Sequence, residues 1–373
     1  MLLFVVFEED ENTMRSSIRS FLIVLTCFVG LTAPRVLHAC TVCVELPKAS
    51  IADHVLAAEV IVLAGPTSGN PFKFSIRRVL KGSDDRLKEI PEIPFLVDSV
   101  MRRAFRSDPT NTVLFTYGAT RTDRAGRSFS RGWKRIFTMT PERKEFIGKL
   151  RSVGQLWTYG ETDSSDRISF FSDYLWHSDH VLHSTALVEI GRAPYDLVRP
   201  IGDRVSTNQI LEELNRLDRF VYRPTVIRLL GLQSDTHARS IVRQRYIKAL
   251  NNGGLNAFEW ALAGIEADGA LAIKSIDLVL QGNQMTDDDK WAFVRALTEA
   301  GSSQPRFRGE IIAILLTVLE RDRILAARIA FATRNWGQTP LHQQFKAIAD
   351  HELTDPATEF VLNMVLDQEV AVE

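Results

Sequence analysis

Apolar residues recur at helical spacing through the C-terminal two-thirds of the chain. Leu182, Ala186 and Ile190 follow one another at four-residue steps and therefore share one face of a predicted helix. Asp179 precedes that helix, where a carboxylate accepts hydrogen bonds from free backbone N–H groups. Pro194 favours the first turn of the next helix. The pattern therefore predicts short helices joined by tight corners.

The same pattern continues over residues 166–373, where the sequence predicts helices only. Gly191, Gly231 and Gly264 mark recurring helix corners at spacings of 40 and 33 residues. Helical-hairpin repeats of the HEAT type have such periods, and one hairpin cannot bury its apolar face without stacked neighbours. We therefore expect an all-α, HEAT-like solenoid. Its helices are expected to begin or end at Ser206 (with Gln209 in a capping box), Asp235, Thr286 and the pair Gly253-Gly254.

Before these helices the sequence shows the period of β-strands. Phe72, Phe74 and Ile76 alternate with polar residues, Gly82 ends that strand, and Pro141 later begins a helix. Five short strands and a closing helix predict a small β-barrel or sandwich. The other strand candidates are Val55–Leu63, Ile93–Val97, Thr112–Tyr117 and Ser128–Thr138.

This part of the chain resembles a known barrel. An opening Cys pair, an Ala-x-x-Val strand and the sequence F-x-I-x-R-V-L-K-G over residues 74–82 are similar to the netrin-like OB barrels of metalloprotease inhibitors. Those barrels carry C-x-C and further cysteines, which this chain lacks. The resemblance implies an OB-type barrel.

The N-terminal residues have the pattern of a secretory signal. Arg15 and Arg19 follow Met14, and an apolar run extends over residues 21–33. A basic region before an apolar stretch of about 7–15 residues is typical of a signal peptide, whereas a membrane-spanning helix needs about 20. We therefore expect export without a transmembrane span, with residues 1–39 removed and Met14 as the natural start.

Cleavage after Ala39 makes Cys40 the first residue of the mature protein. Leu37 suits signal peptidase poorly, and Leu-x-Ala-Cys resembles a lipoprotein box in which Cys40 would carry a lipid anchor. His38 is unusual in such a box. The sequence favours a free periplasmic or extracellular protein and leaves the lipid-anchored form as the alternative.

Cys40 and Cys43, in CTVC, are the only cysteines left after cleavage. A local disulfide, a redox pair, half a metal site, or an acylated Cys40 beside a free thiol would each use them. A zinc site needs four ligands and no second C-x-x-C exists, while haem attachment needs His where Val44 stands. A thioredoxin-type redox pair lies at the N-terminus of a helix that follows a strand, whereas Cys40 and Cys43 would lie at the start of the mature chain. We predict a structural disulfide in an oxidising compartment.

Basic residues gather between residues 99 and 135, interleaved with aromatic residues and with only two acidic ones. Such side chains on a barrel are typical of polyanion or single-strand binding. Export makes nucleic acid an unexpected ligand, and solvated loop charges are the alternative interpretation. The basic residues are Arg102, Arg103, Arg106, Arg121, Arg124, Arg127, Arg131, Lys134 and Arg135.

One cluster has the composition of a metal site. His177, Asp179, His180 and His183 form H-x-D-H-x-x-H, and the last two share a helix face. The cluster lies at a predicted corner, where exposed polar residues are the ordinary alternative. No cofactor is expected elsewhere, because the sequence has no Gly-rich phosphate loop, nucleophile elbow or HExxH motif. Five tryptophans are expected in the core: Trp157, Trp176, Trp260, Trp291 and Trp336.

The motifs together resemble one family. HACTVC, a small β domain, the segment SDYLWHSDHVLHSTALVEIGRAPYDLVRP and then RPTVIRLLGLQSD are similar to a family of uncharacterised secreted bacterial proteins. The resemblance covers about residues 38–350 and implies an A-C-x-x-C start and a HEAT-like domain, with no activity to carry over. The chain departs from the family at Thr41-Val42, where aromatic residues are usual.

We therefore expect a multi-domain α and β protein: a signal peptide over 1–39, a β domain over 40–155, a linker over 156–165 and helical repeats over 166–373. The formal net charge of −1 selects no polyanionic or membrane partner. The favoured function is non-catalytic binding of another protein or a cell-envelope component. The alternatives are a redox or metal-dependent envelope enzyme using the cysteines or histidines, and polyanion binding through residues 102–135.

Overall fold

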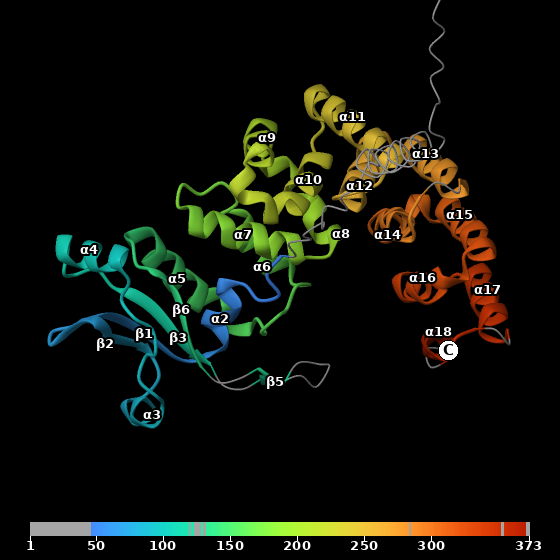
Figure 1. Cartoon of the computed structure of the whole chain (residues 1–373). Coiled ribbons are helices and arrows are strands. Elements are labelled where there is room, and N and C mark those ends of the chain that lie inside the picture. Colours follow the sequence, from blue (N-terminus) through green and yellow to red (C-terminus); the bar gives the residue numbers. More distant parts are fainter. Residues whose placement is uncertain are drawn as a thin grey trace, which may run out of the picture. The chain divides into compact units, whose positions relative to one another are not determined.

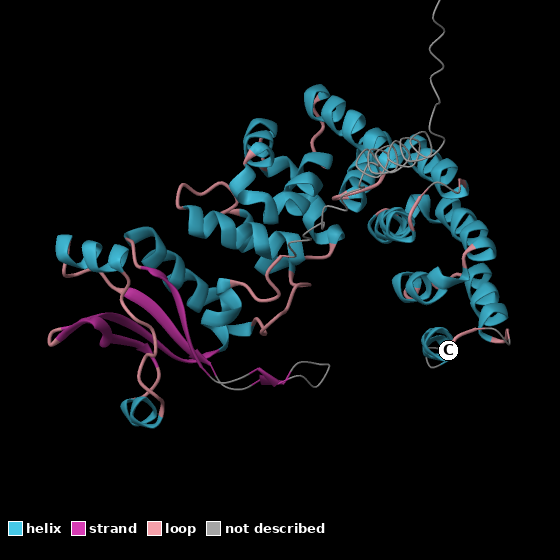
Figure 2. Cartoon of the chain, viewed as in Figure 1, coloured by secondary structure: helices cyan, strands magenta, loops and turns pink. Residues whose placement is uncertain are grey.

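The computed structural model shows a mostly helical chain with one small antiparallel sheet (Figure 1; Figure 2). Contacts divide the chain after Cys43, and residues 44–373 form one compact unit. In the described part of the chain, no helix is both long and apolar enough to cross a membrane. The structure describes residues 46–118, 121–122, 128–129, 132–282, 285–351 and 354–370.

The sheet is open, so the predicted barrel or sandwich is wrong. Its four strands lie in the order β2–β1–β3–β6, and each neighbouring pair is antiparallel. β2 and β6 stand at opposite edges and do not pair with each other. The strands are β1 (Ala58–Thr67), β2 (Asn70–Lys81), β3 (Val113–Gly118) and β6 (Gly132–Thr138), with β4 (Arg121–Thr122) and β5 (Ser128–Phe129) paired separately.

Helices cover both faces of this sheet, which removes the need for closure. Ile61 of β1 belongs to the core shared with α2 (Ile51–Ala57) and α5 (Pro141–Val153). Its neighbours Val60 and Val62 belong to a second core on the other side, which Phe105 of α4 (Ser99–Ser107) completes. The period of two in β1 thus divides its apolar residues between two cores.

Two predicted strands differ from the structure. Val55–Leu63 begins inside α2, because Ser50 and Asp53 form a reciprocal capping box that starts a helix there, and the strand starts only at Ala58. Ile93–Val97 makes a single bridge, between Leu96 and Lys73. Prolines at both 91 and 94 lack the N–H that a ladder needs.

The C-terminal part is helical, as predicted, and the helices for which a cap was predicted begin at that cap. The Asp179 carboxylate accepts hydrogen bonds from the N–H groups of Val181 and Leu182, and Asp235 and Thr286 cap their helices in the same manner. The helices are α6 (Ser165–Ser172), α7 (His180–Arg192), α8 (Tyr195–Val198), α9 (Thr207–Asn215), α10 (Arg223–Gly231), α11 (Thr236–Asn252), α12 (Ala257–Asp268), α13 (Ala270–Gln281), α14 (Asp287–Ser303), α15 (Arg308–Arg321), α16 (Ala326–Thr333), α17 (Thr339–Ala349) and α18 (Pro356–Val370), with α3 (Asp84–Glu89) beside the sheet.

From α10 onward the helices alternate between two layers. The even-numbered helices α10, α12, α14, α16 and α18 contact one another in succession, and so do the odd-numbered helices α11, α13, α15 and α17. Gly231 permits one of these contacts, because a Cβ there would lie 2.7 Å from the Ala263 Cα of α12. Assignment of these layers to a HEAT-like solenoid stays a prediction.

The apolar core is continuous from the sheet into the helices. Leu182, Ala186 and Ile190 are buried, which confirms their predicted common face. They share one core with Leu114 of β3 and Phe146 of α5. The domain boundaries expected at 155 and 166 stay a prediction, which the hydrogen-exchange experiment in the Discussion tests.

Candidate functional site

A groove of about 460 Å³ crosses the even-numbered helices near the C-terminus. α14 contributes Trp291, Arg295 and Glu299, which recur every four residues and therefore lie along one face. α16 and α18 supply the opposite side, which is mainly apolar. The other lining residues are Thr298, Ser302, Ala327, Arg328, Phe331, Ala332 and Val361.

Exposed aromatic rings make this region apolar although water reaches it. Phe331 of α16 is 52% exposed and lines the groove, and Phe360 of α18, next to the groove residue Val361, is 68% exposed. Trp291, which the sequence placed in the core, is only half-buried and turns part of its ring to the groove. Exposed apolar surface of this kind marks binding sites more often than scattered single side chains do.

The two groove arginines stack on aromatic rings instead of pairing with carboxylates. The Arg295 guanidinium lies 3.9 Å from the Phe258 ring centroid, and that of Arg328 lies 5.3 Å from the Trp291 centroid. Within the described chain, neither guanidinium makes a hydrogen bond or an ion pair. Their donors are therefore held in place by stacking and remain available to a carboxylate.

Two other polar groups of the groove already accept hydrogen bonds from the protein. The Glu299 carboxylate accepts a hydrogen bond from the Tyr195 backbone N–H at 3.2 Å. The Ser302 hydroxyl accepts one from the Trp336 indole N–H at 3.1 Å. The groove consequently offers an apolar surface, two guanidinium groups without hydrogen-bond partners and the single carboxylate of Glu299, so its net charge is positive and suits an apolar ligand that carries negative charge.

The sequence alone does not identify this groove. The spacing of Trp291, Arg295 and Glu299 on one helix was the available signal, and an amphipathic core helix has the same spacing. Arg328 and Phe331 come from another helix, and nothing in their sequence neighbourhood connects them to α14. Only the packing of α14 against α16 brings the two sets together.

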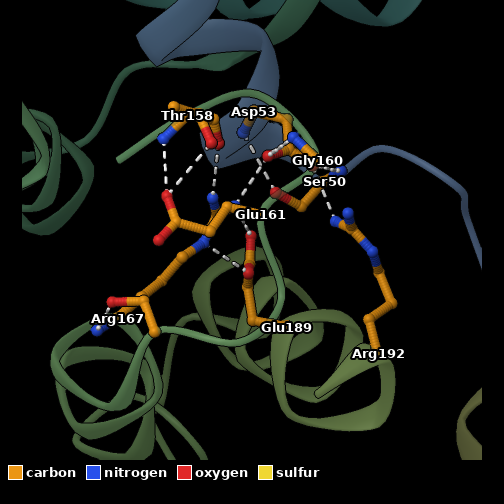
Figure 3. A network of polar contacts seen from close by, with 9 residues as sticks. Ser50, Asp53, Thr158, Gly160, Glu161, Arg167, Glu189 and Arg192 are labelled. Atoms are coloured by element: carbon orange, nitrogen blue, oxygen red, sulfur yellow. Dashed lines mark hydrogen bonds and ion pairs between the residues drawn. The ribbon is translucent and has the colours of Figure 1, made fainter. Parts of the chain in front are cut away.

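Apart from the groove, a buried cluster of charged side chains joins the sheet region to the helices (Figure 3). Arg167 Nη2 lies 2.7 Å from Asp53 Oδ1 and 2.8 Å from Glu189 Oε1, while Arg192 Nη1 lies 2.6 Å from Asp53 Oδ2. Burial raises the pKa of Asp53, but Arg167 and Arg192 outweigh that effect and hold the pKa below its ordinary value. Two arginines and two carboxylates balance one another, so this cluster is a structural joint between α2, α6 and α7.

The predicted metal cluster does not come together. The Asp179 carboxylate caps α7 and pairs with Arg143 of α5 at 2.7 Å, so these partners already use it and it does not serve as a metal ligand. The ring nitrogen of His177 accepts the Asp179 backbone N–H. His180 is exposed, whereas His183 is buried against Trp176. Among the described residues, no group of three or more His, Cys, Asp or Glu side chains is placed to hold a metal ion.

His183 should make stability depend on pH. Burial, together with Arg219 and Arg216, lowers its pKa to about 4. The unfolded histidine titrates near 6.5, so the unfolded state gains a proton first and stability falls between about pH 6.5 and 4, by about 3 kcal/mol in all. We expect His183→Phe to remove this loss, measured as the free energy of unfolding in urea at pH 7 and pH 4.

A control separates this effect from other acid-sensitive groups. His180→Phe changes an exposed histidine on the same helix and should leave the wild-type pH dependence intact. An identical pH dependence in wild type and His183→Phe would show that His183 keeps an ordinary pKa.

The basic segment is only partly described. Lys134 and Arg135 are exposed on β6, and Arg135 Nη1 lies 3.4 Å from Asp98 Oδ2. The Arg102 guanidinium stacks on Phe72. The anion site predicted from this segment stays a prediction, because four of its side chains lie outside the described part: Arg121, Arg124, Arg127 and Arg131.

Cys40 and Cys43 also lie outside the described residues, so their disulfide, redox or acylated states stay predictions. Comparison with protein-family models, with curated proteins and with solved structures gives no match to this chain. The resemblance to a family of secreted bacterial proteins therefore also stays a prediction, and the function has to be argued from the groove.

Proposed function

We propose that the protein is a non-catalytic binding protein whose helices hold an apolar, acidic peptide segment of a partner protein in the groove across α14, α16 and α18. The observation that carries this proposal is the pair Arg295 and Arg328. Each guanidinium is stacked on an aromatic ring, and within the described chain neither makes a hydrogen bond or an ion pair, although Glu259 and Glu299 are near enough to attract Arg295.

The chemistry of the groove defines the peptide. Phe331 and Trp291 offer apolar contact, so the peptide should present aromatic or long aliphatic side chains. Arg295 and Arg328 should bind one or two carboxylates between or beside those side chains. Arginine and tryptophan are also the residue types in which binding energy concentrates at protein interfaces.

The helical arrangement supports the same proposal. We infer that the alternating layers from α10 to α18 are HEAT-like repeats, because each helix contacts its counterpart two helices further along. Repeat arrays of this kind commonly use one layer as an extended binding surface. The groove residues all come from the even-numbered layer.

The cellular setting is part of the proposal. The basic and apolar N-terminal residues predict export to the periplasm or the cell exterior, either free or anchored through Cys40. A partner would then be another exported protein or a component of the cell envelope.

Selection from a displayed random-peptide library tests the groove directly. We expect the wild-type protein to enrich peptides in which Asp or Glu lies within a few residues of Trp, Phe or Leu. For an enriched peptide, Arg328→Glu and Phe331→Asp should each weaken binding at least about tenfold by fluorescence anisotropy, a loss within the range of interface hot spots. Arg328→Glu should also shift the selection toward peptides containing Lys or Arg.

Matched controls lie on the other layer. Arg245→Glu on α11 and Leu271→Asp on α13 introduce the same kinds of change at exposed positions remote from the groove lining. Both should bind the selected peptides like the wild type. Enrichment of peptides without acidic residues, or equal losses in groove and control variants, would contradict the proposal.

A further inference from the structure

The two groove arginines occupy equivalent positions on successive even-numbered helices. Arg295 of α14 stacks on Phe258 of α12, and Arg328 of α16 stacks on Trp291 of α14. In both pairs the arginine follows its aromatic partner by 37 residues. The helices α12, α14 and α16 contact one another in succession. The same arginine–aromatic contact is therefore repeated one helix further along the array.

Each of the two helices also places an aromatic ring beside its arginine in the groove. On α14, Trp291 lies four residues before Arg295, and on α16, Phe331 lies three residues after Arg328. Residues at these spacings share one face of a helix. Both arginines and Phe331 are exposed, and Trp291 is half-buried. The groove thus repeats a unit of one cation and one aromatic ring from helix to helix.

Apolar positions stand on both sides of this pair of cations. The equivalent positions recur every 33 residues on α12, α14, α16 and α18: Leu262, Arg295, Arg328 and Val361. Leu262 is buried, and Val361 lines the groove. Glu259, one turn before Leu262, attracts Arg295 from α12. The groove therefore presents two cationic positions, followed on the α18 side by an apolar one.

The distance between packed helices sets the spacing of the charges that this groove can bind. Neighbouring helix axes lie about 8–10 Å apart, so side chains at equivalent positions are separated by about that distance. A polyproline II helix has three residues per turn and rises about 3.1 Å per residue, which places residues i and i+3 on one face about 9.3 Å apart. A β-strand places residues of one face about 6.7 or 13 Å apart. Of these two extended conformations, polyproline II matches the two arginines.

We propose that the peptide in the groove adopts the polyproline II conformation and carries two acidic residues three positions apart, one for Arg295 and one for Arg328. This inference rests on the proposed function and adds the conformation and charge spacing of the ligand. The residues beside the carboxylates would be prolines or other apolar residues that pack on Trp291 and Phe331. Aromatic-lined grooves suit such ligands, because a polyproline II helix is already ordered before it binds.

Fluorescence anisotropy with synthetic peptides tests the spacing. The peptides share one composition, with two aspartates separated by two, three or four positions in a background of proline and alanine. We expect the three-position isomer to bind at least about tenfold more tightly than the other two, because only its carboxylates reach both guanidinium groups together. A third aspartate three positions further should not tighten binding, since the flanking positions of the groove are apolar.

An α-helical ligand is the alternative conformation. A helix places residues seven positions apart on one face about 10.5 Å apart, which also approaches the spacing of neighbouring helices. An alanine-rich, helix-forming peptide with aspartates at that spacing should bind at least about tenfold more weakly than the three-position isomer. Tighter binding by the helical peptide would overturn the proposal.

Variants show whether the two arginines read the spacing. Arg295→Gln and Arg328→Gln should each weaken binding of the three-position isomer at least about tenfold and should bind all three isomers equally. Arg245→Gln, at an exposed position on α11, should keep the wild-type affinity and preference.

The outcomes distinguish this inference from the proposed function. Equal binding of the three isomers, a preference that survives in both groove variants, or failure of the proline-rich peptides where library-selected peptides bind would overturn the inference alone. If neither these peptides nor any library-selected peptide bound the protein, the proposed function would fail as well.

Discussion

Replacing Arg167 by methionine is expected to lower the free energy of unfolding by about 3–5 kcal/mol. The guanidinium lies between the carboxylates of Asp53 and Glu189, and all three side chains are almost completely buried. Without it, two carboxylates face each other in the core with only Arg192 to balance them. Urea denaturation at neutral pH measures the loss.

An exposed arginine supplies the matched control. Arg216 pairs with Asp218 at 2.8 Å, but both side chains reach solvent, so Arg216→Met should cost far less than Arg167→Met. Arg167→Met in an Asp53→Asn, Glu189→Gln background should recover part of the loss, since the carboxylates would no longer be charged. If Arg167→Met proved no more harmful than Arg216→Met, the four buried charges would not act as a joint.

Leu182→Ala is expected to cost about 2–5 kcal/mol, because the side chain is buried and the truncation leaves a cavity. α7 packs against α6 and α10, so we expect amide hydrogen exchange to speed up in these three helices. The strands β1 and β3 should keep more of their protection if the sheet region is a separate domain. Hydrogen exchange followed by mass spectrometry resolves these segments.

The same experiment decides the predicted domain boundaries. Equal loss of protection in β1, β3 and α10 would mean that the shared core and the Asp53–Arg167 contact make the whole region one cooperative unit. Leu271→Ala, at an exposed position on α13, should change neither stability nor exchange. If hydrogen exchange in Leu182→Ala matched that of the wild type, the Leu182 side chain would contribute little to the packing of these helices.

Local chemistry explains the parts of the fold that the sequence predicted well. Asp179, Asp235 and Thr286 cap helices because each side chain reaches a backbone N–H within its own next turn. Gly253 ends α11 with a φ of 63°, a conformation that glycine adopts without strain. Such features involve residues a few positions apart, so the sequence alone determines them.

The same local reasoning failed where two local signals competed. The β-branched and aliphatic residues of Val55–Leu63 favour a strand, but the capping box at Ser50 starts a helix that continues through Ala57. In the H-x-D-H-x-x-H motif, the Asp179 carboxylate pairs with Arg143, which lies 36 residues earlier in the chain. Motif spacing gives no information about a competing partner so far away.

The sequence by itself therefore determined the division into a β-rich region and a helical region, several helix caps and the buried face of α7, because these follow from the identities of neighbouring residues. It did not predict α2, α3 and α4 in the β-rich region. Tertiary structure decided the open sheet, the joint between Asp53 and Arg192 across 139 residues, and the groove that α14 forms with α16 and α18. Each of these depends on which distant side chains meet when the helices pack. Burial then fixes the outcome, because a charge or apolar group removed from water is stable only beside the partner that packing supplies.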